Sequence, residues 1–80
     1  MVNATMQSEG NVMLKKLTNK QIEFLIDEWI HNKRNRNLAK EKLIDGISFE
    51  RLSEDYKLSV TQTKTIVKEV KKTILEHFPQ

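Results

Sequence analysis

The chain contains no cysteine, one proline and two glycines among its 80 residues. The lack of cysteine excludes disulfide bonds and thiolate metal sites, and it is compatible with a reducing compartment. Because the glycines are only Gly10 and Gly46, there is no Gly-rich phosphate-binding loop. No apolar run approaches the roughly 18 residues of a membrane helix, and no basic start followed by an apolar segment indicates a signal peptide. We therefore expect a cytoplasmic protein without a membrane partner.

Residues that could carry catalysis or bind a metal are also few. His31 and His77 lie far apart in the sequence, and neither has a second histidine nearby, so we expect no metal site. The acidic pairs at 27–28 and 54–55 are sequence neighbours, which point in different directions on a helix and do not form an acid–base dyad. No hydroxyl lies in a nucleophile motif. We predict that the protein is not an enzyme and carries no cofactor.

The length allows one small domain, and its charge is mildly basic and uneven. The formal net charge is +3, which permits an anionic partner without requiring one. Basic residues dominate 33–42 and 57–72, whereas acidic residues gather at 23–28 and 50–55. For each block by itself, a solvated helix face is the simpler interpretation.

Capping signals and apolar spacing predict two helices in the first half. Thr18 and Gln21 have the spacing of a capping box. The apolar stripe that follows predicts a helix ending near residue 32, with Trp29 packed against the last helix. This stripe consists of Leu17 before the cap, then Ile22, Leu25, Ile26, Trp29 and Ile30. A shorter helix is predicted over 35–45, because Gly46 can adopt the left-handed conformation that commonly ends a helix.

The stretch 48–67 contains either one interrupted helix or two helices. Ser48 can cap a helix, and Ser59 with Gln62 then repeats the capping-box spacing. Because a new cap cannot lie inside a continuing helix, the chain must begin a second helix at Ser59. The last helix is predicted over about 60–78, and its inward residues are Thr63, Ile66, Val67, Val70, Ile74 and Phe78. Two helices joined by residues 57–59 have the layout of a helix-turn-helix.

The outward face of this last helix consists of threonine and lysine: Thr61, Lys64, Thr65, Lys68, Lys71 and Lys72. Lysine neutralises phosphates and reaches guanine O6 or N7, whereas threonine bonds a phosphate or base edge and touches the thymine methyl group. The N-terminal part of such a helix enters the major groove most deeply. Together with the three-residue turn, this composition favours DNA binding over a merely solubilising face.

Residues 45–70, DGISFERLSEDYKLSVTQTKTIVKEV, resemble the DNA-binding region four of bacterial sigma factors. They are most similar to the small region-four-like proteins of phages and mobile elements in Gram-positive bacteria. The resemblance depends on the run from Gly46 to Phe49, which opens the first helix of the motif, and on Leu58 with Ser59, which opens the recognition helix. A basic lead-in upstream extends it to Asp27–Phe78.

Some positions depart from the family pattern. Ser53 stands where the family has Ala or Gly, which is a benign change. Lys57 stands where the turn often has Gly, so a left-handed backbone there would cost about 1 kcal/mol. Thr63 stands where Val or Ile is buried, which predicts a looser core. Val60 is unusual at a base-facing position.

Carried over by position, the resemblance implies five base-facing residues, Val60, Thr61, Lys64, Thr65 and Lys68. We expect contacts to the DNA backbone from Arg34, Arg36, Lys40 and Ser59. The prediction is an all-α domain of four helices over 17–80, with a C-terminal helix-turn-helix and a disordered tail over 1–16. It would bind specific double-stranded DNA in transcriptional regulation, as a repressor, an activator or an accessory of RNA polymerase.

Two alternatives stay open. The domain could be a protein-interaction module that binds RNA polymerase or a phage protein, which an exposed Trp29 would support. It could also be the DNA-recognition domain of a packaging protein. The sequence does not indicate whether the protein is a monomer or a dimer.

Overall fold

The computed structural model describes residues 17–77. Within this range there are four α-helices and no strand: α2 (Asn19–Trp29), α3 (Lys33–Leu43), α4 (Phe49–Tyr56) and α5 (Val60–Glu76). For the residues that the structure describes, the prediction of an all-α domain with four helices is therefore confirmed. The predicted disordered tail over 1–16 lies outside the described residues, as do Phe78 and Pro79.

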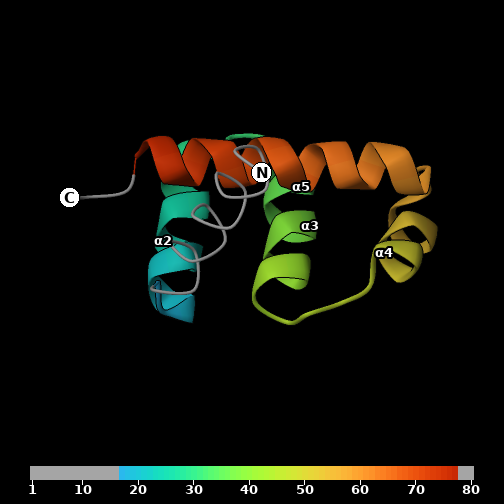
Figure 1. Cartoon of the computed structure of the whole chain (residues 1–80), viewed down its shortest axis with the longest axis horizontal. Coiled ribbons are helices and arrows are strands. Elements are labelled where there is room, and N and C mark those ends of the chain that lie inside the picture. Colours follow the sequence, from blue (N-terminus) through green and yellow to red (C-terminus); the bar gives the residue numbers. More distant parts are fainter. Residues whose placement is uncertain (1–16, 78–80) are drawn as a thin grey trace, which may run out of the picture.

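Helix α5 is the central helix in the packing of the described residues. It packs against each of the other three helices, and α3 also contacts both α2 and α4. Figure 1 shows α5 running along one edge, with α2, α3 and α4 descending from it in that order. Helix α4 thus lies beneath the N-terminal half of α5, and α2 beneath its C-terminal half.

The first two helices begin at side-chain caps. Thr18 and Gln21 form the predicted capping box, in which the Gln21 amide donates to Thr18 Oγ1 at 3.1 Å and the Thr18 amide donates to Gln21 Oε1 at 2.8 Å. Helix α2 ends at Trp29, earlier than predicted, because the chain turns to a second cap at Asn32. The Asn32 side chain accepts a hydrogen bond from the Asn35 amide at 3.1 Å, which starts α3 two residues before the predicted position.

The stretch 48–67 forms two helices. Ser48 Oγ accepts from the Arg51 amide at 3.2 Å and starts α4. Ser59 and Gln62 form the second capping box, with bonds of 2.9 and 3.0 Å, and start α5. Between the two helices, Lys57 has φ 56° and ψ 44°, which is the left-handed conformation. The family resemblance predicted this strain, because a residue with a side chain stands where glycine is favoured.

The turn is closed by backbone hydrogen bonds to the end of α4. The Leu58 amide donates to the Ser53 carbonyl at 2.9 Å, and the Lys57 amide donates to the Glu54 carbonyl at 3.3 Å. This pair of bonds is a Schellman motif, which satisfies carbonyls that a helix end leaves unpaired. The connection of three residues between α4 and α5 is therefore fixed by its own hydrogen bonds.

The core consists of two clusters along α5. The larger joins α2, α3 and the second half of α5 through Ile22, Leu25, Ile26, Ala39, Val70 and Ile74. The smaller joins α3, α4 and the middle of α5 through Leu38, Leu52 and Val67. Ile66 and Leu43 pack against both clusters and connect them.

Two core predictions have different outcomes. Thr63 is fully buried, as predicted, and its hydroxyl donates to the Ser59 carbonyl at 2.9 Å, so its polar atom is satisfied. Trp29 was expected to be buried against the last helix; its ring does contact His77 at the end of that helix, but the residue is 43% exposed. Because α2 ends at Trp29, its side chain lies beyond the core, where its ring stacks on His77 at a centroid distance of 3.7 Å.

Candidate functional site

The predicted base-facing residues lie on the first half of α5. Thr61, Lys64, Thr65 and Lys68 are all exposed, and we call these four the α5 face; Val60 is half-buried. Their orientation follows from the opposite side of the helix, where Thr63, Val67, Val70 and Ile74 are buried.

The hydroxyl of Thr65 is partly committed to its own helix. Thr65 Oγ1 donates to the Thr61 carbonyl at 3.0 Å, so its hydrogen is used within α5. Its oxygen lone pairs remain able to accept, and its methyl group is available for apolar contact. Thr65 is therefore suited to accepting a hydrogen bond or to touching an apolar group.

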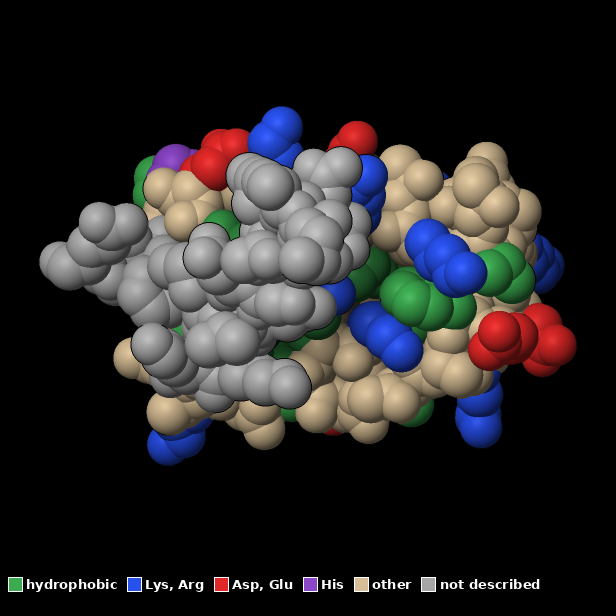
Figure 2. Space-filling model, viewed as in Figure 1, with side chains coloured by type: hydrophobic (Ala, Val, Ile, Leu, Met, Phe, Trp, Pro, Cys, Tyr) green, Lys and Arg blue, Asp and Glu red, His purple; other side chains and the backbone are tan. Residues whose placement is uncertain are grey.

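Lysines surround an aromatic ring on one flank of the α5 face. The Nζ of Lys64 lies 5.8 Å from the centre of the Phe49 ring, and the Nζ of Lys42 lies 4.3 Å from it. Each ammonium group is close enough to the ring to be attracted by its face. The two ammonium groups are therefore at most about 10 Å apart. Figure 2 shows Lys and Arg side chains beside exposed hydrophobic atoms in the region where α3, α4 and the first half of α5 meet.

An arginine lies on the other flank. Arg34, in the first turn of α3, lines a groove of about 280 Å³ together with Leu58, Thr61, Gln62, Thr65 and Ile66. Its Nε donates to Asn35 Oδ1 at 3.1 Å, which orients the guanidinium. The sequence alone did not indicate which residues lie near Arg34, whereas the structure brings it beside two threonines of the α5 face.

The other predicted backbone contacts lie in different settings. Lys40 Nζ is 2.6 Å from Asp27 Oδ1 of α2, so its charge is compensated within the protein. Arg36 is half-buried. Ser59 is exposed, but its Oγ already accepts from the Gln62 amide as part of the capping box. Arg34 is the predicted phosphate contact that shares a groove with Thr61 and Thr65 of the α5 face.

Lys42 is a residue that sequence reasoning missed as a site. It belongs to the basic block 33–42, which was the available signal. Its proximity to Lys64 depends on the turn between α3 and α4, which brings Phe49 close to both lysines.

A partly buried hydrogen bond connects α3 and α4. The hydroxyl of Tyr56 donates to Glu41 Oε2 across the two helices. Burial, the hydrogen bond to Glu41 and the nearby carboxylates raise the pKa of Tyr56 to about 12. The neutral phenol is therefore the form that the fold stabilises.

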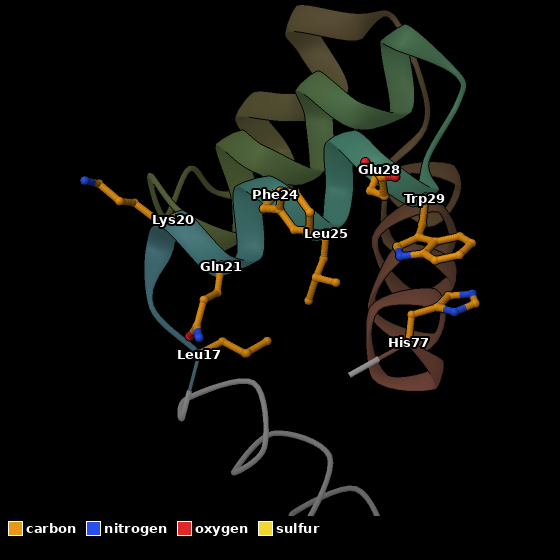
Figure 3. Close-up of a pocket in the computed structure, with 8 residues that line it drawn as sticks. All are labelled: Leu17, Lys20, Gln21, Phe24, Leu25, Glu28, Trp29 and His77. Carbon is orange, nitrogen blue, oxygen red and sulfur yellow. The ribbon is translucent and has the colours of Figure 1, made fainter. Parts of the chain in front are cut away.

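A second concave surface lies at the opposite end of the molecule. An open cleft of about 570 Å³ is lined by Leu17, Lys20, Gln21, Phe24, Leu25, Glu28, Trp29 and His77. Figure 3 shows the stacked rings of Trp29 and His77 at one side of this aromatic cleft, with side chains of α2 along the other. Phe24 is 62% exposed. The sequence did not predict this surface, because it placed Trp29 in the core.

Within residues 17–77 no group of three or more acidic or histidine side chains could hold a metal ion. In the same range no helix has the length and apolarity needed to cross a membrane. No protein-family model, curated protein or solved structure matches the chain.

Proposed function

We propose that the protein binds specific double-stranded DNA in transcriptional regulation, with α4 and α5 as a helix-turn-helix. In this proposal the first half of α5 enters the major groove. The domain would then be sigma region-four-like, of phage or mobile-element type. The capped start of α5 and the left-handed residue in a three-residue turn support that layout.

The observation that carries the proposal is the position of cations on both flanks of the α5 face. Gln62 and Ile66 lie on the flank near Arg34, and Lys64 lies on the opposite flank near Lys42. Threonines thus lie between positive charges. This arrangement suits a helix in a groove, because base edges lie at the centre of a groove and phosphates line both of its sides.

The spacing of the flanking cations agrees with this arrangement. Arg34 and Lys42 are eight residues apart on α3, which corresponds to roughly 12 Å along the helix axis. The major groove of B-form DNA is also about 12 Å wide. We infer that Arg34 and Lys42 contact phosphates on opposite sides of the groove, whereas Lys40 does not because Asp27 holds it.

Selection from a pool of random duplexes tests this function directly. We expect one enriched motif, and an affinity for it that falls steeply as the salt concentration rises, because phosphate contacts release counterions. Binding without enrichment of a motif would mean that the α5 face attracts DNA only by its positive charge and does not read the sequence. No binding at low salt would remove the proposal.

A second candidate function is a protein-interaction module that binds RNA polymerase or a phage protein. The aromatic cleft favours it, because Phe24 and Trp29 are large hydrophobic side chains that stay exposed. Weak salt dependence and unchanged binding after substitutions on the α5 face would distinguish this function from DNA binding.

A further inference from the structure

Three exposed residues of α2 follow one line along the helix. Lys20, Phe24 and Glu28 are spaced four apart and therefore lie on the same side of α2. We call them the α2 stripe. Figure 3 shows Lys20 near the start of α2, Phe24 in the middle and Glu28 near the end. The stripe thus carries a positive charge, a large apolar ring and a negative charge in sequence.

We propose that this surface binds a second copy of the chain, with the two α2 helices antiparallel about a two-fold axis at Phe24. A two-fold axis requires a surface that complements itself. In an antiparallel pair centred on Phe24, Lys20 faces Glu28 of the partner subunit, and the same pair recurs on the other side of the axis. The α2 stripe therefore meets an opposite charge at both ends, which a parallel arrangement would not provide.

Within residues 17–77 the side chains at both ends form no ion pair. The ion pairs in this range are Lys40–Asp27 and Arg51–Asp55, and neither includes Lys20 or Glu28. The distance between Lys20 and Glu28 along the axis is roughly 12 Å, because each residue adds 1.5 Å. Both charges therefore lie beyond the ring of Phe24 and would form the polar rim of the interface.

The apolar part of the contact is the aromatic cleft. Leu17, Leu25 and Trp29 line it beside the α2 stripe. Near the axis, Phe24 of the partner subunit would pack beside Phe24, which would remove both exposed rings from water. This burial provides a driving force that the two charge pairs alone would not provide, because exposed ion pairs contribute little.

The dimer leaves the α5 face free. His77, which lines the cleft, follows Thr61 by 16 residues along α5, which corresponds to roughly 24 Å. The interface is therefore independent of the proposed DNA binding, and its test contains no DNA. If the chain both dimerises through α2 and binds DNA through α5, the dimer presents two α5 helices that are related by a two-fold axis.

Sedimentation equilibrium of the full chain tests the proposal over about 1 μM to 1 mM, the range of weak association. We expect a monomer–dimer equilibrium in which Phe24→Ser weakens dimerisation at least tenfold. A monomer at every concentration would overturn the proposal and leave the cleft to another protein or to a segment of the same chain. A dimer that Phe24→Ser does not weaken would mean that a different face is used.

A charge exchange provides the second, fold-independent test. Lys20→Glu and Glu28→Lys each place like charges opposite one another in both pairs, and we expect each to weaken the dimer about tenfold, equivalent to 1.4 kcal/mol. The double variant restores opposite charges, and we expect it to recover the parent dissociation constant. Both single changes suit the helix dipole of α2, so they should not unfold the monomer.

Lys72→Glu, an exposed change of the same charge on α5, is the matched control and should leave dimerisation unchanged. Equal weakening by Lys72→Glu would show a general charge effect. Failure of the double variant to recover dimerisation would show that Lys20 and Glu28 do not face each other. Either result would overturn the antiparallel α2 arrangement.

Discussion

The two ends of α5 differ in chemistry although one continuous helix supports both. The N-terminal half exposes threonine and lysine and is flanked by Arg34 and Lys42 from α3. The C-terminal end borders a cleft with exposed aromatic rings, and the described residues that line this cleft include a single cation, Lys20. Substitutions at one end should therefore affect polar, salt-sensitive binding, whereas those at the other should affect apolar contacts.

The largest effect on stability is expected in the part of the core that packs against the C-terminal half of α5. Ile74 is fully buried against α2 and α3, so Ile74→Ala should lower the free energy of unfolding by about 2 to 5 kcal/mol. Urea denaturation followed by circular dichroism measures this loss. Ile74→Val is the control, and it should cost only about 0.5 to 1.5 kcal/mol. Equal losses would mean that the site collapses around the smaller side chain.

At the opposite end, the expected effect is on DNA binding. Lys64→Ala should weaken cognate binding by about 1 to 3 kcal/mol and relax the preference at one base position. Arg34→Ala should weaken cognate and random duplexes similarly and lower the salt slope by about one unit, as expected for a phosphate contact. Titrations of both duplexes at several salt concentrations separate the two effects.

Lys71→Ala is the control for these titrations, because Lys71 lies well beyond the first two turns of α5. It should change little. If Lys64→Ala and Lys71→Ala cause equal losses without a change in base preference, α5 is not a recognition helix.

The exposed position of Trp29 makes its contribution to stability smaller than that of a buried tryptophan. Trp29→Ala should cost about 1 to 2 kcal/mol, mainly from the lost stack on His77, since an aromatic pair contributes about 0.5 to 1.5 kcal/mol. Thermal melts of the parent and the variant measure the difference. A loss of about 3 to 5 kcal/mol would instead indicate that the ring is buried in solution.

The turn before α5 offers a substitution that stabilises. Lys57→Gly should raise stability by about 1 kcal/mol, because glycine adopts the left-handed conformation without strain. Lys57→Ala removes the same charge but keeps the strain, so it should bring no comparable gain. Chemical denaturation of the three proteins at one pH compares them.

The last expected effect is a pH dependence of stability at the contact between α3 and α4. The pKa of Tyr56 is raised from 10 to about 12 in the folded protein, so the stability from its neutral phenol is fully present below pH 10. That contribution is lost as the pH rises from 10 through about 12. The difference in stability between the parent and Tyr56→Phe should therefore shrink across this window. A constant difference would show that the phenol titrates equally in the folded and unfolded chain.

The fold was predictable where its signals are local. Thr18 with Gln21 and Ser59 with Gln62 each satisfy backbone amides three residues away, so the spacing alone indicated where α2 and α5 begin. The start of α3 was missed because Asn32 is one of several asparagines in a polar stretch. Helical spacing placed Trp29 in the apolar stripe of α2, but Trp29 is the last residue of that helix, where its ring stacks on His77 and stays partly exposed.

The candidate site was predictable only in part, because the residues on both of its flanks are brought there by contacts between helices. The outward face of α5 followed from helical spacing, which is a property of the sequence. Three contacts depend instead on the packing of α3. They are the ion pair of Asp27 with Lys40, the closeness of Phe49 to both Lys42 and Lys64, and the groove that Arg34 shares with Thr61. Such contacts between helices cannot be predicted from the spacing of residues in one sequence.

The division of the core into two clusters has a consequence for local opening. Helix α4 contacts α3 and α5 but not α2, and the smaller cluster holds only Leu38, Leu52 and Val67 as buried members. Release of α4 would therefore leave the larger cluster, with α2, α3 and the second half of α5, intact. Amide hydrogens of α4 should exchange through this partial unfolding, at a lower free energy than those around Ile26 and Ile74. A partner bound at the first half of α5 would suppress the opening and slow exchange in α4, although it need not touch that helix.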